Sequence, residues 1–302
     1  MKHTQRISLV MAAFGLAAGG SFAHDLRGIV GEVNATDART QQKINEIAAY
    51  RKSLAQMVQP GNGQVEAVVR TALRWNTPRI TVCFQDGTGD GQSRVAAVAR
   101  EWSQGTGVTF DFGAAGEPRF CDATRPSDIR VSFGPGGFWS YVGTIAREIP
   151  PDRPTLNLDG LSHPGDFTDY ERSVVLHEFG HALGFEHEHQ SPKSGCQEQF
   201  NWPYLYSSMG WEPEKVRFNM ARFDQSGAMN GLESTAFDRA SVMLYSLSRE
   251  SFVQPATASC YIPQANIKLS PVDLSAARYL YPPMPGGAPA QSRSTLAADP
   301  KR

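Results

Sequence analysis

The sequence has few cysteines, almost no net charge and only one long apolar run. Four of its 302 residues are cysteine, and the formal net charge is −1 at pH 7. This balance gives no electrostatic reason to expect nucleic acid or an anionic membrane surface as a partner. With 40% hydrophobic and 20% charged residues, the composition is typical of a globular protein with one domain of ordinary size plus extensions. We expect it to act as a monomer.

The apolar run lies within residues 1–23 and has the pattern of a secretory signal peptide. Lys2 and Arg6 precede an apolar stretch at residues 7–18, and Ser21 and Ala23 have the small-x-small spacing of a cleavage site. A membrane anchor is the alternative, but the stretch is short for a bilayer and no later stretch could cross one. The prediction is therefore a secreted or periplasmic protein.

Export makes the cysteines candidates for disulfide bonds, because exported proteins reach oxidising compartments. The four positions are Cys83, Cys121, Cys196 and Cys260, which allow three connectivities. None belongs to a CxxC pair, so a metal site built on the cysteines is not expected. Pairing Cys83 with Cys121 and Cys196 with Cys260 keeps each bond on one side of the central helix described next, and we favour it. Buried free thiols are the alternative.

The most informative stretch runs from His177 to His187 and reads H-E-x-x-H-x-x-G-x-x-H. On a helix, His177 and His181 share one face and can aim at one Zn²⁺. Glu178 is placed to deprotonate a zinc-bound water. Gly184 lets the helix end with a positive φ, so that the chain returns His187 as the third ligand. These residues predict one catalytic Zn²⁺ with an open coordination position. Chance would assemble five fixed residues in on the order of 10⁻⁵ of such sequences.

The remaining periodicity predicts an α+β domain. The zinc helix should begin at Thr168, whose capping-box partner is Glu171. Further helices are expected at 37–58, 65–73, 93–104, 213–218 and 274–280, and strands at 79–84, 108–112, 128–133, 141–146 and 155–158. Residues 86–91 read as a plain loop, with calcium binding as the weaker alternative. The order predicts one twisted, mixed sheet with two helices above an irregular C-terminal subdomain. The expected divisions are 1–23, 24–74, 75–283 and a disordered tail at 284–302.

Several motifs resemble the astacin family of the metzincin clan. Residues 241–245 match its S-x-M-x-Y turn, 138–143 its W-S-Y-V-G strand, 184–188 its G-F-x-H-E and 269–281 its closing helix. The resemblance implies a secreted zinc endopeptidase acting on proteins or peptides, with a metzincin-type fold. It makes Met243 a structural floor beneath the metal. It makes Tyr245 a labile zinc ligand that swings to bind the oxyanion, whereas a buried core tyrosine is the alternative.

The sequence also departs from the family. The usual x-x-R-x-D-R-D run is missing after Glu188, and Phe138 stands where many members have cysteine.

His189 is a competing ligand at the wrong spacing, and we interpret it as a cleft-edge or surface histidine. His163 and His24 are interpreted as solvated. The substrate is expected to pair with an edge strand at residues 155–158.

Residues 24–74 are interpreted as an inhibitory prosegment or a permanent helical extension. The family's F-x-G-D blocking pattern is absent, and Asp25 and Asp37 are the candidate replacements. Cleavage after Arg70 or Arg74 would release a mature chain, and the resemblance links a freed N-terminus to Glu188. Two other functions stay open: a secreted zinc-binding module without turnover, and a zinc hydrolase of cell-wall peptides. Glu178 speaks against the first, since metal binding needs no base.

Overall fold

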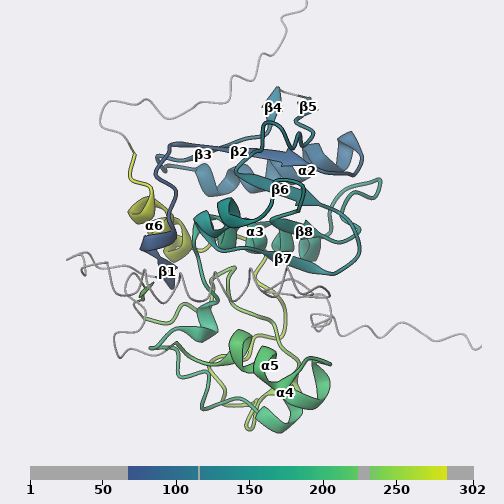
Figure 1. Cartoon of the computed structure of the whole chain (residues 1–302). Coiled ribbons are helices and arrows are strands. Elements are labelled where there is room, and N and C mark those ends of the chain that lie inside the picture. Colours follow the sequence, from purple (N-terminus) through teal and green to yellow (C-terminus); the bar gives the residue numbers. More distant parts are fainter. Residues whose placement is uncertain (1–66, 115, 224–231, 235, 284–302) are drawn as a thin grey trace, which may run out of the picture.

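The computed structural model describes residues 67–114, 116–223, 232–234 and 236–283. They form a half that contains a β-sheet and a more irregular half, with helix α3 beside the boundary (Figure 1). The predicted signal peptide, the helix expected at 37–58 and the C-terminal tail lie outside the described residues. No described helix has the length and apolarity needed to cross a membrane.

A five-stranded mixed sheet forms the upper half. Its strands lie in the order β3 (Thr109–Asp111), β2 (Arg79–Phe84), β6 (Ile129–Ser132), β8 (Leu156–Leu158) and β7 (Phe138–Ser140). The first four run parallel, and β7 pairs antiparallel with β8. Every residue of β6 and β8 is buried, as expected for interior parallel strands. The expectation that residues 155–158 form an edge strand is wrong, because β7 covers β8 and is itself the edge.

Two helices pack together on this sheet, as predicted. Helix α2 (Gly89–Ala99) is capped by the Thr88 side chain and continues as the 3₁₀ helix η2 (Arg100–Ser103). Helix α3 (Asp169–Leu183) begins with the predicted capping box of Thr168 and Glu171. Both contribute to one apolar core with the sheet, and the Trp102 indole donates a 2.8 Å hydrogen bond to the Leu176 carbonyl. The C-terminal helix α6 (Pro271–Leu280) adds to the same core.

Tertiary contacts overrode three sequence-based expectations in this half. The strand expected at 141–146 is wrong: β7 ends at Ser140, and the chain turns into η3 (Gly143–Glu148). Gly143 has a φ of +53°, and a Cβ there would lie 2.0 Å from the Leu73 carbonyl oxygen. The helix expected at 65–73 is also wrong, because β1 (Val69–Arg70) and η1 (Thr71–Leu73) occupy its described part. The loop expected at 86–91 ends early, since Thr88 starts a helix at Gly89.

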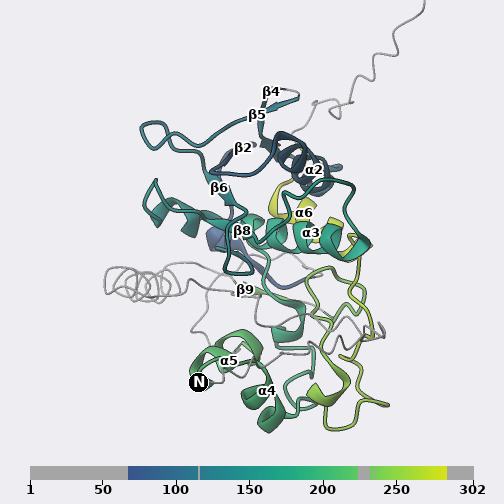
Figure 2. The same cartoon turned by 90° about the vertical axis from the view of Figure 1, so that its right-hand side faces the viewer.

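Segment 67–70 packs between distant parts of the chain instead of forming a helix. Strand β1 pairs with β9 (Leu232–Glu233; Figure 2). The Arg70 N–H donates to the Gly184 carbonyl at 2.8 Å, and the Glu186 N–H donates to the Val68 carbonyl at 2.9 Å. These bonds tie the segment to the chain that leaves α3. They replace the intrahelical bonds that the local periodicity favoured.

The lower half is built on a second, smaller core. It contains α4 (Trp202–Ser208) and α5 (Pro213–Met220) together with the short 3₁₀ helices η4 (Glu188–Gln190) and η5 (Arg249–Ser251). Pro213 at the start of α5 agrees with the predicted helix there. Sequence periodicity missed α4, whose N-cap is Asn201.

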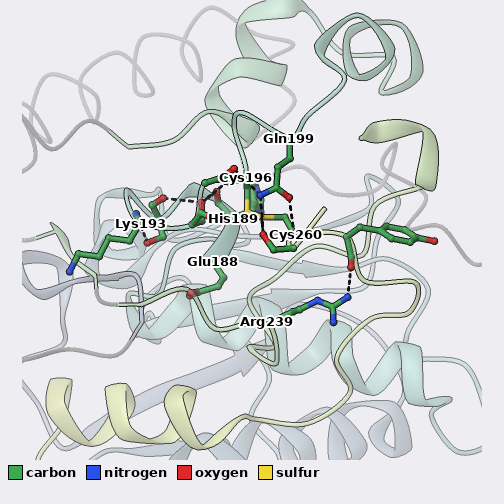
Figure 3. The surroundings of a disulfide bond; sticks show 12 residues. Glu188, His189, Lys193, Cys196, Gln199, Arg239 and Cys260 are labelled. Carbon is green, nitrogen blue, oxygen red and sulfur yellow. Dashed lines mark hydrogen bonds between the residues drawn. A yellow bond between two sulfur atoms is a disulfide. The ribbon is translucent and has the colours of Figure 1, made fainter. Parts of the chain in front are cut away.

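Disulfides form in the pairing that the sequence analysis favoured. Cys83–Cys121 joins β2 to the chain after the hairpin of β4 (Gly113–Ala114) and β5 (Glu117–Pro118). Cys196–Cys260 closes the lower core (Figure 3). Gln199 binds across this second bond, accepting from the Cys260 N–H at 3.1 Å and donating to the Gly195 carbonyl at 3.0 Å.

Gly180 is the glycine of α3 that sets how closely the helix packs. A Cβ at this position would lie 2.5 Å from the Met243 Sδ and 2.9 Å from Trp102 Cζ2. Overpacking of this kind costs about 1–3 kcal/mol. We expect Gly180→Ala to lower the free energy of unfolding by that amount in a urea titration. Gly89→Ala is the matched control, because a Cβ there meets nothing within 4 Å. Equal stability of the two variants would contradict the packing described here.

Candidate active site

Three histidines converge where α3 ends. His177 and His181 lie on α3, and Gly184 closes the helix with a φ of +103°. The Phe185 N–H donates to the Gly180 carbonyl at 3.0 Å and the Gly184 N–H to the His181 carbonyl at 2.8 Å. This left-handed closure turns the chain back towards α3. As a result, ring nitrogens of His177, His181 and His187 all lie within 4.8 Å of one another.

Each imidazole has its Nδ1 side facing an oxygen acceptor. His177 Nδ1 lies 2.9 Å from the Val242 carbonyl, and His181 Nδ1 lies 2.8 Å from the Phe185 carbonyl. His187 Nδ1 lies 3.0 Å from the Gln190 Oε1. Because such oxygens only accept, the Nδ1 atoms carry the protons and the Nε2 lone pairs are left to bind a metal.

The Nε2 atoms of His181 and His187 are 3.1 Å apart. With protons on both Nδ1 atoms, two lone pairs face each other, which is unfavourable unless a cation lies beside both. A tetrahedral Zn²⁺ with Zn–N bonds of about 2.0–2.1 Å places ligand nitrogens at roughly this separation. Burial lowers the pKa of His181, and burial together with the neighbouring histidines holds the pKa of His187 well below its usual range. Neutral, buried imidazoles of this kind fit a zinc ion.

Glu178 is buried next to His177. Burial raises the pKa of its carboxyl well above the usual value, and its Oε2 has no hydrogen-bond partner among the described residues. His177 and Glu178 also line a cavity of about 10 Å³ with Phe138, Val174, Leu244 and Asn266 among its other walls. That is close to the volume that holds one water molecule. The carboxyl is therefore placed beside the triad without being one of its three ligands.

The turn at residues 241–245 lies against the triad. Asp273, the N3 residue of α6, accepts from the Ser241 hydroxyl at 2.6 Å and from the Val242 N–H at 2.9 Å. Val242 in turn offers its carbonyl to His177. Met243 is buried beneath α3 against Gly180. The turn thus links the N-terminal end of α6 to His177.

Tyr245 extends from this turn into the lower core. Its ring is 1% exposed and has its centroid 4.2 Å from that of His187 and 5.5 Å from that of His177. Burial raises its pKa well above the usual value, with a further contribution from Glu178. The structure therefore brings the tyrosine and the glutamate to the same triad.

His189 does not lie where the sequence analysis put it. We expected a cleft-edge or surface side chain, but His189 is 1% exposed and its ring stacks on His187. Its Nε2 donates to the Asn219 carbonyl at 2.8 Å. His163 is partly exposed and lies 2.7 Å from Glu171 instead of being only solvated. His24 lies outside the described residues.

Glu188 is also buried, at 1% exposure. Burial, with added repulsion from Asp273 and Asp238, raises its pKa to about 8. Its carboxyl accepts from the Asp238 N–H at 2.8 Å. Sequence reasoning gave no role at the site to two further residues around the triad, Asp273, which it placed only in the closing helix, and Gln190. Asp273 was detectable as the partner of Ser270 in a second capping box, whereas no sequence pattern pointed to Gln190.

Comparison with known proteins agrees with this geometry. The family model described as Astacin (Peptidase family M12A) matches residues 67–281. The chain belongs to the astacin family. It is 26% identical over 184 residues to zinc metalloproteinase nas-13 of Caenorhabditis elegans, covering 60% of this chain and 34% of the relative. It is 24% identical over 230 residues to blastula protease 10 of Paracentrotus lividus, covering 73% and 34%. The chain thus spans about a third of each relative's length.

Among solved structures, one described as the structure of myroilysin superposes with a TM-score of 0.59 and 29% sequence identity. The match covers 72% of this chain and 98% of that one. The α+β prediction, with a mixed sheet and a metzincin-type catalytic domain, is confirmed by this similarity and by the family match.

Proposed function

We propose that the protein is a zinc-dependent endopeptidase that hydrolyses peptide bonds with Glu178 as general base. The observation that supports this most is one buried place that holds three histidines, with ring nitrogens within 4.8 Å of one another, and a carboxyl outside the ligand set. A module that only binds zinc needs the histidines but not the carboxyl. The family match adds the peptidase class.

His177, His181 and His187 would hold the ion through Nε2. When bound, Zn²⁺ supplies a Lewis acid that lowers the pKa of water and polarises a carbonyl oxygen. The Glu178 carboxylate takes a proton from the attacking water and returns it to the leaving nitrogen. Tyr245 donates its hydroxyl to the developing oxyanion. The apolar walls around Glu178 exclude competing water, which strengthens these charge interactions.

The substrate strand is proposed to lie along β7. This strand has one edge paired to β8 and is the last in the sheet, so its other edge can add a strand. Phe138 of β7 lines the same cavity as His177 and Glu178. A peptide paired with β7 would therefore pass directly beside the general base.

Replacing Glu178 with glutamine tests the mechanism. The amide is nearly isosteric and outside the ligand set, so zinc content and thermal stability should stay near wild type. Peptide cleavage should fall by about 10²–10⁴-fold, since general acid–base steps contribute that much. A fluorogenic peptide assay measures cleavage, and 1,10-phenanthroline should abolish it in the wild type.

Glu198→Gln is the matched control for this substitution, because Glu198 is exposed and pairs with Arg222. Its cleavage rate should match wild type. Full activity in Glu178→Gln would mean that another group is the base. Zinc binding without cleavage in every variant, including fully processed wild type, would favour the zinc-binding module. Cleavage of cell-wall peptides but not proteins would favour the third function.

Tyr245→Phe should separate the oxyanion role from a core role. The hydroxyl acts mainly in the transition state, so kcat should fall about 10²–10³-fold with little change in KM. Steady-state kinetics with metal analysis checks this. Tyr281→Phe is the control, because its buried hydroxyl donates to the Leu183 carbonyl at 2.7 Å at the end of α3. It should lower stability and leave kcat unchanged. An unchanged kcat in Tyr245→Phe returns that residue to the core reading.

We propose that the working enzyme is exported and retains residues 67–74. Ala67, Val68 and Val69 are each at most 2% exposed, and Arg70 pairs with Glu186 at 2.5 Å. Burying one valine side chain contributes about 1.5–3 kcal/mol. Cleavage after Arg70 or Arg74 would remove much of this packing, so a processing site is better placed before Ala67.

Intact-mass measurement of active secreted protein should therefore give a first residue between 24 and 67. Chains that begin at Ala67 and at Trp75 can also be compared in urea. The shorter one should lose several kcal/mol of stability, by the valine burial alone. Equal stability, or an active form that begins at Trp75, would restore the boundary after Arg74.

A further inference from the structure

We propose that Gln190 is a positioning residue that orients the third metal ligand, His187, and fixes which of its nitrogens carries the proton. The inference rests on the proposed function only in that the three histidines hold zinc. It assigns a role to a residue that no motif of the sequence marked.

The Gln190 side chain is 3% exposed and makes three contacts, all at normal hydrogen-bond lengths. Its Oε1 lies 3.0 Å from His187 Nδ1. Its Nε2 donates to the Phe218 carbonyl at 2.8 Å and to the Ala221 carbonyl at 3.0 Å. The backbone is held as well, since the Phe223 N–H donates to the Gln190 carbonyl at 3.0 Å.

These contacts permit one orientation of the amide. Two backbone carbonyls can only accept, so the group that faces them must be the NH₂ with its two donors. The oxygen must then face His187. An amide oxygen can only accept, so His187 Nδ1 must carry the proton and the Nε2 lone pair points into the triad. The Phe218 and Ala221 carbonyls therefore set the tautomer of His187. They do so by orienting the Gln190 amide and do not contact the imidazole themselves.

His187 differs in this respect from the other two ligands. The Nδ1 atoms of His177 and His181 face the backbone carbonyls of Val242 and Phe185. A substitution at residue 242 or 185 would leave these acceptors in place, because they belong to the backbone. Of the three Nδ1 atoms, that of His187 is the one that faces a side-chain acceptor. It is also the ligand that lies outside α3, so helical geometry does not fix its ring.

The platform behind Gln190 is the C-terminal end of α5. The last carbonyls of a helix lack intrahelical donors and need partners from elsewhere. Gln190 satisfies those of Phe218 and Ala221, and His189 Nε2 satisfies that of Asn219. Through this docking, the lower half of the molecule holds the ligand that α3 cannot hold. Mutating a group that orients a metal-bound histidine typically lowers metal affinity or activity about 10–100-fold.

The test measures zinc affinity by competition with a chromogenic chelator and follows thermal unfolding of the zinc-free protein. Gln190→Met removes the acceptor and both donors at similar size. Gln199→Met is the matched control, since Gln199 lies in the same half and makes three hydrogen bonds around Cys196–Cys260. Gln190→Glu keeps an acceptor for His187 but loses the donors to α5. Gln190→Asn, one methylene too short, replaces Gln190→Met if that variant does not fold.

We expect Gln190→Met to bind zinc about 10–100-fold more weakly than wild type and Gln199→Met to bind it as wild type does. Gln190→Glu should keep zinc affinity closer to wild type while its zinc-free form is at least as destabilised as Gln190→Met. Equal affinity in Gln190→Met and Gln199→Met would overturn the proposal. So would equal loss in Gln190→Glu and Gln190→Met, which would assign Gln190 to folding alone. Wild-type protein that takes up no zinc would instead refute the proposed function itself.

Discussion

Three buried imidazoles whose ring nitrogens lie within 4.8 Å of one another impose the main constraint on this structure. Burial lowers the pKa of His181 and of His187, and the 3.1 Å approach of their Nε2 atoms is unfavourable without a cation beside both. Much of the hydrogen bonding around the site therefore holds the rings in place. Each Nδ1 has its own acceptor, two of them in the chain just after α3 and the third in the turn at residues 241–245. The site is thus assembled by the whole fold and not by α3 alone.

The two apolar cores meet at this site. Met243 belongs to the core beneath the sheet, and Tyr245, two residues later, belongs to the lower core. The turn between them is held by the carboxyl of Asp273, whose pKa is raised to about 6 by burial despite three hydrogen bonds to it. A buried carboxyl that accepts from a hydroxyl and two backbone N–H groups is costly to place but specific. It gives the turn one conformation, and with it the carbonyl that orients His177.

The lower half has little regular structure, yet it supplies the support that the third ligand lacks on α3. The end of α5 binds η4 through His189 and Gln190, and the Ser194 hydroxyl donates to the His189 carbonyl and accepts from the Cys196 N–H. The Cys196–Cys260 bond then joins this region to the segment after the turn. The fixed position of His187 therefore depends on a half of the molecule that periodicity in the sequence barely revealed.

The sequence by itself determined what is local. The spacing of His177, His181 and His187, the capping box at Thr168 and the glycine that closes α3 follow from helix geometry, so they were legible without coordinates. Strand β2 was placed residue by residue because its β-branched residues lie between clear turn signals. Order along the chain only favoured the cysteine pairing that the structure shows, with two other connectivities and free thiols left open.

Only the tertiary structure decided the rest, because those outcomes depend on partners distant in sequence. The chain turns into η3 at Gly143, where it packs against Leu73 of η1, and residues 69–70 form a strand because β9 and the chain after α3 offer this segment hydrogen bonds. His189 is buried because α5 supplies a carbonyl 30 residues away. Gln190 faces His187 for the same reason. Periodicity in a sequence shows which face of a helix or strand is apolar. It does not show which distant group will satisfy the polar atoms of that element, and here such distant groups orient the histidines.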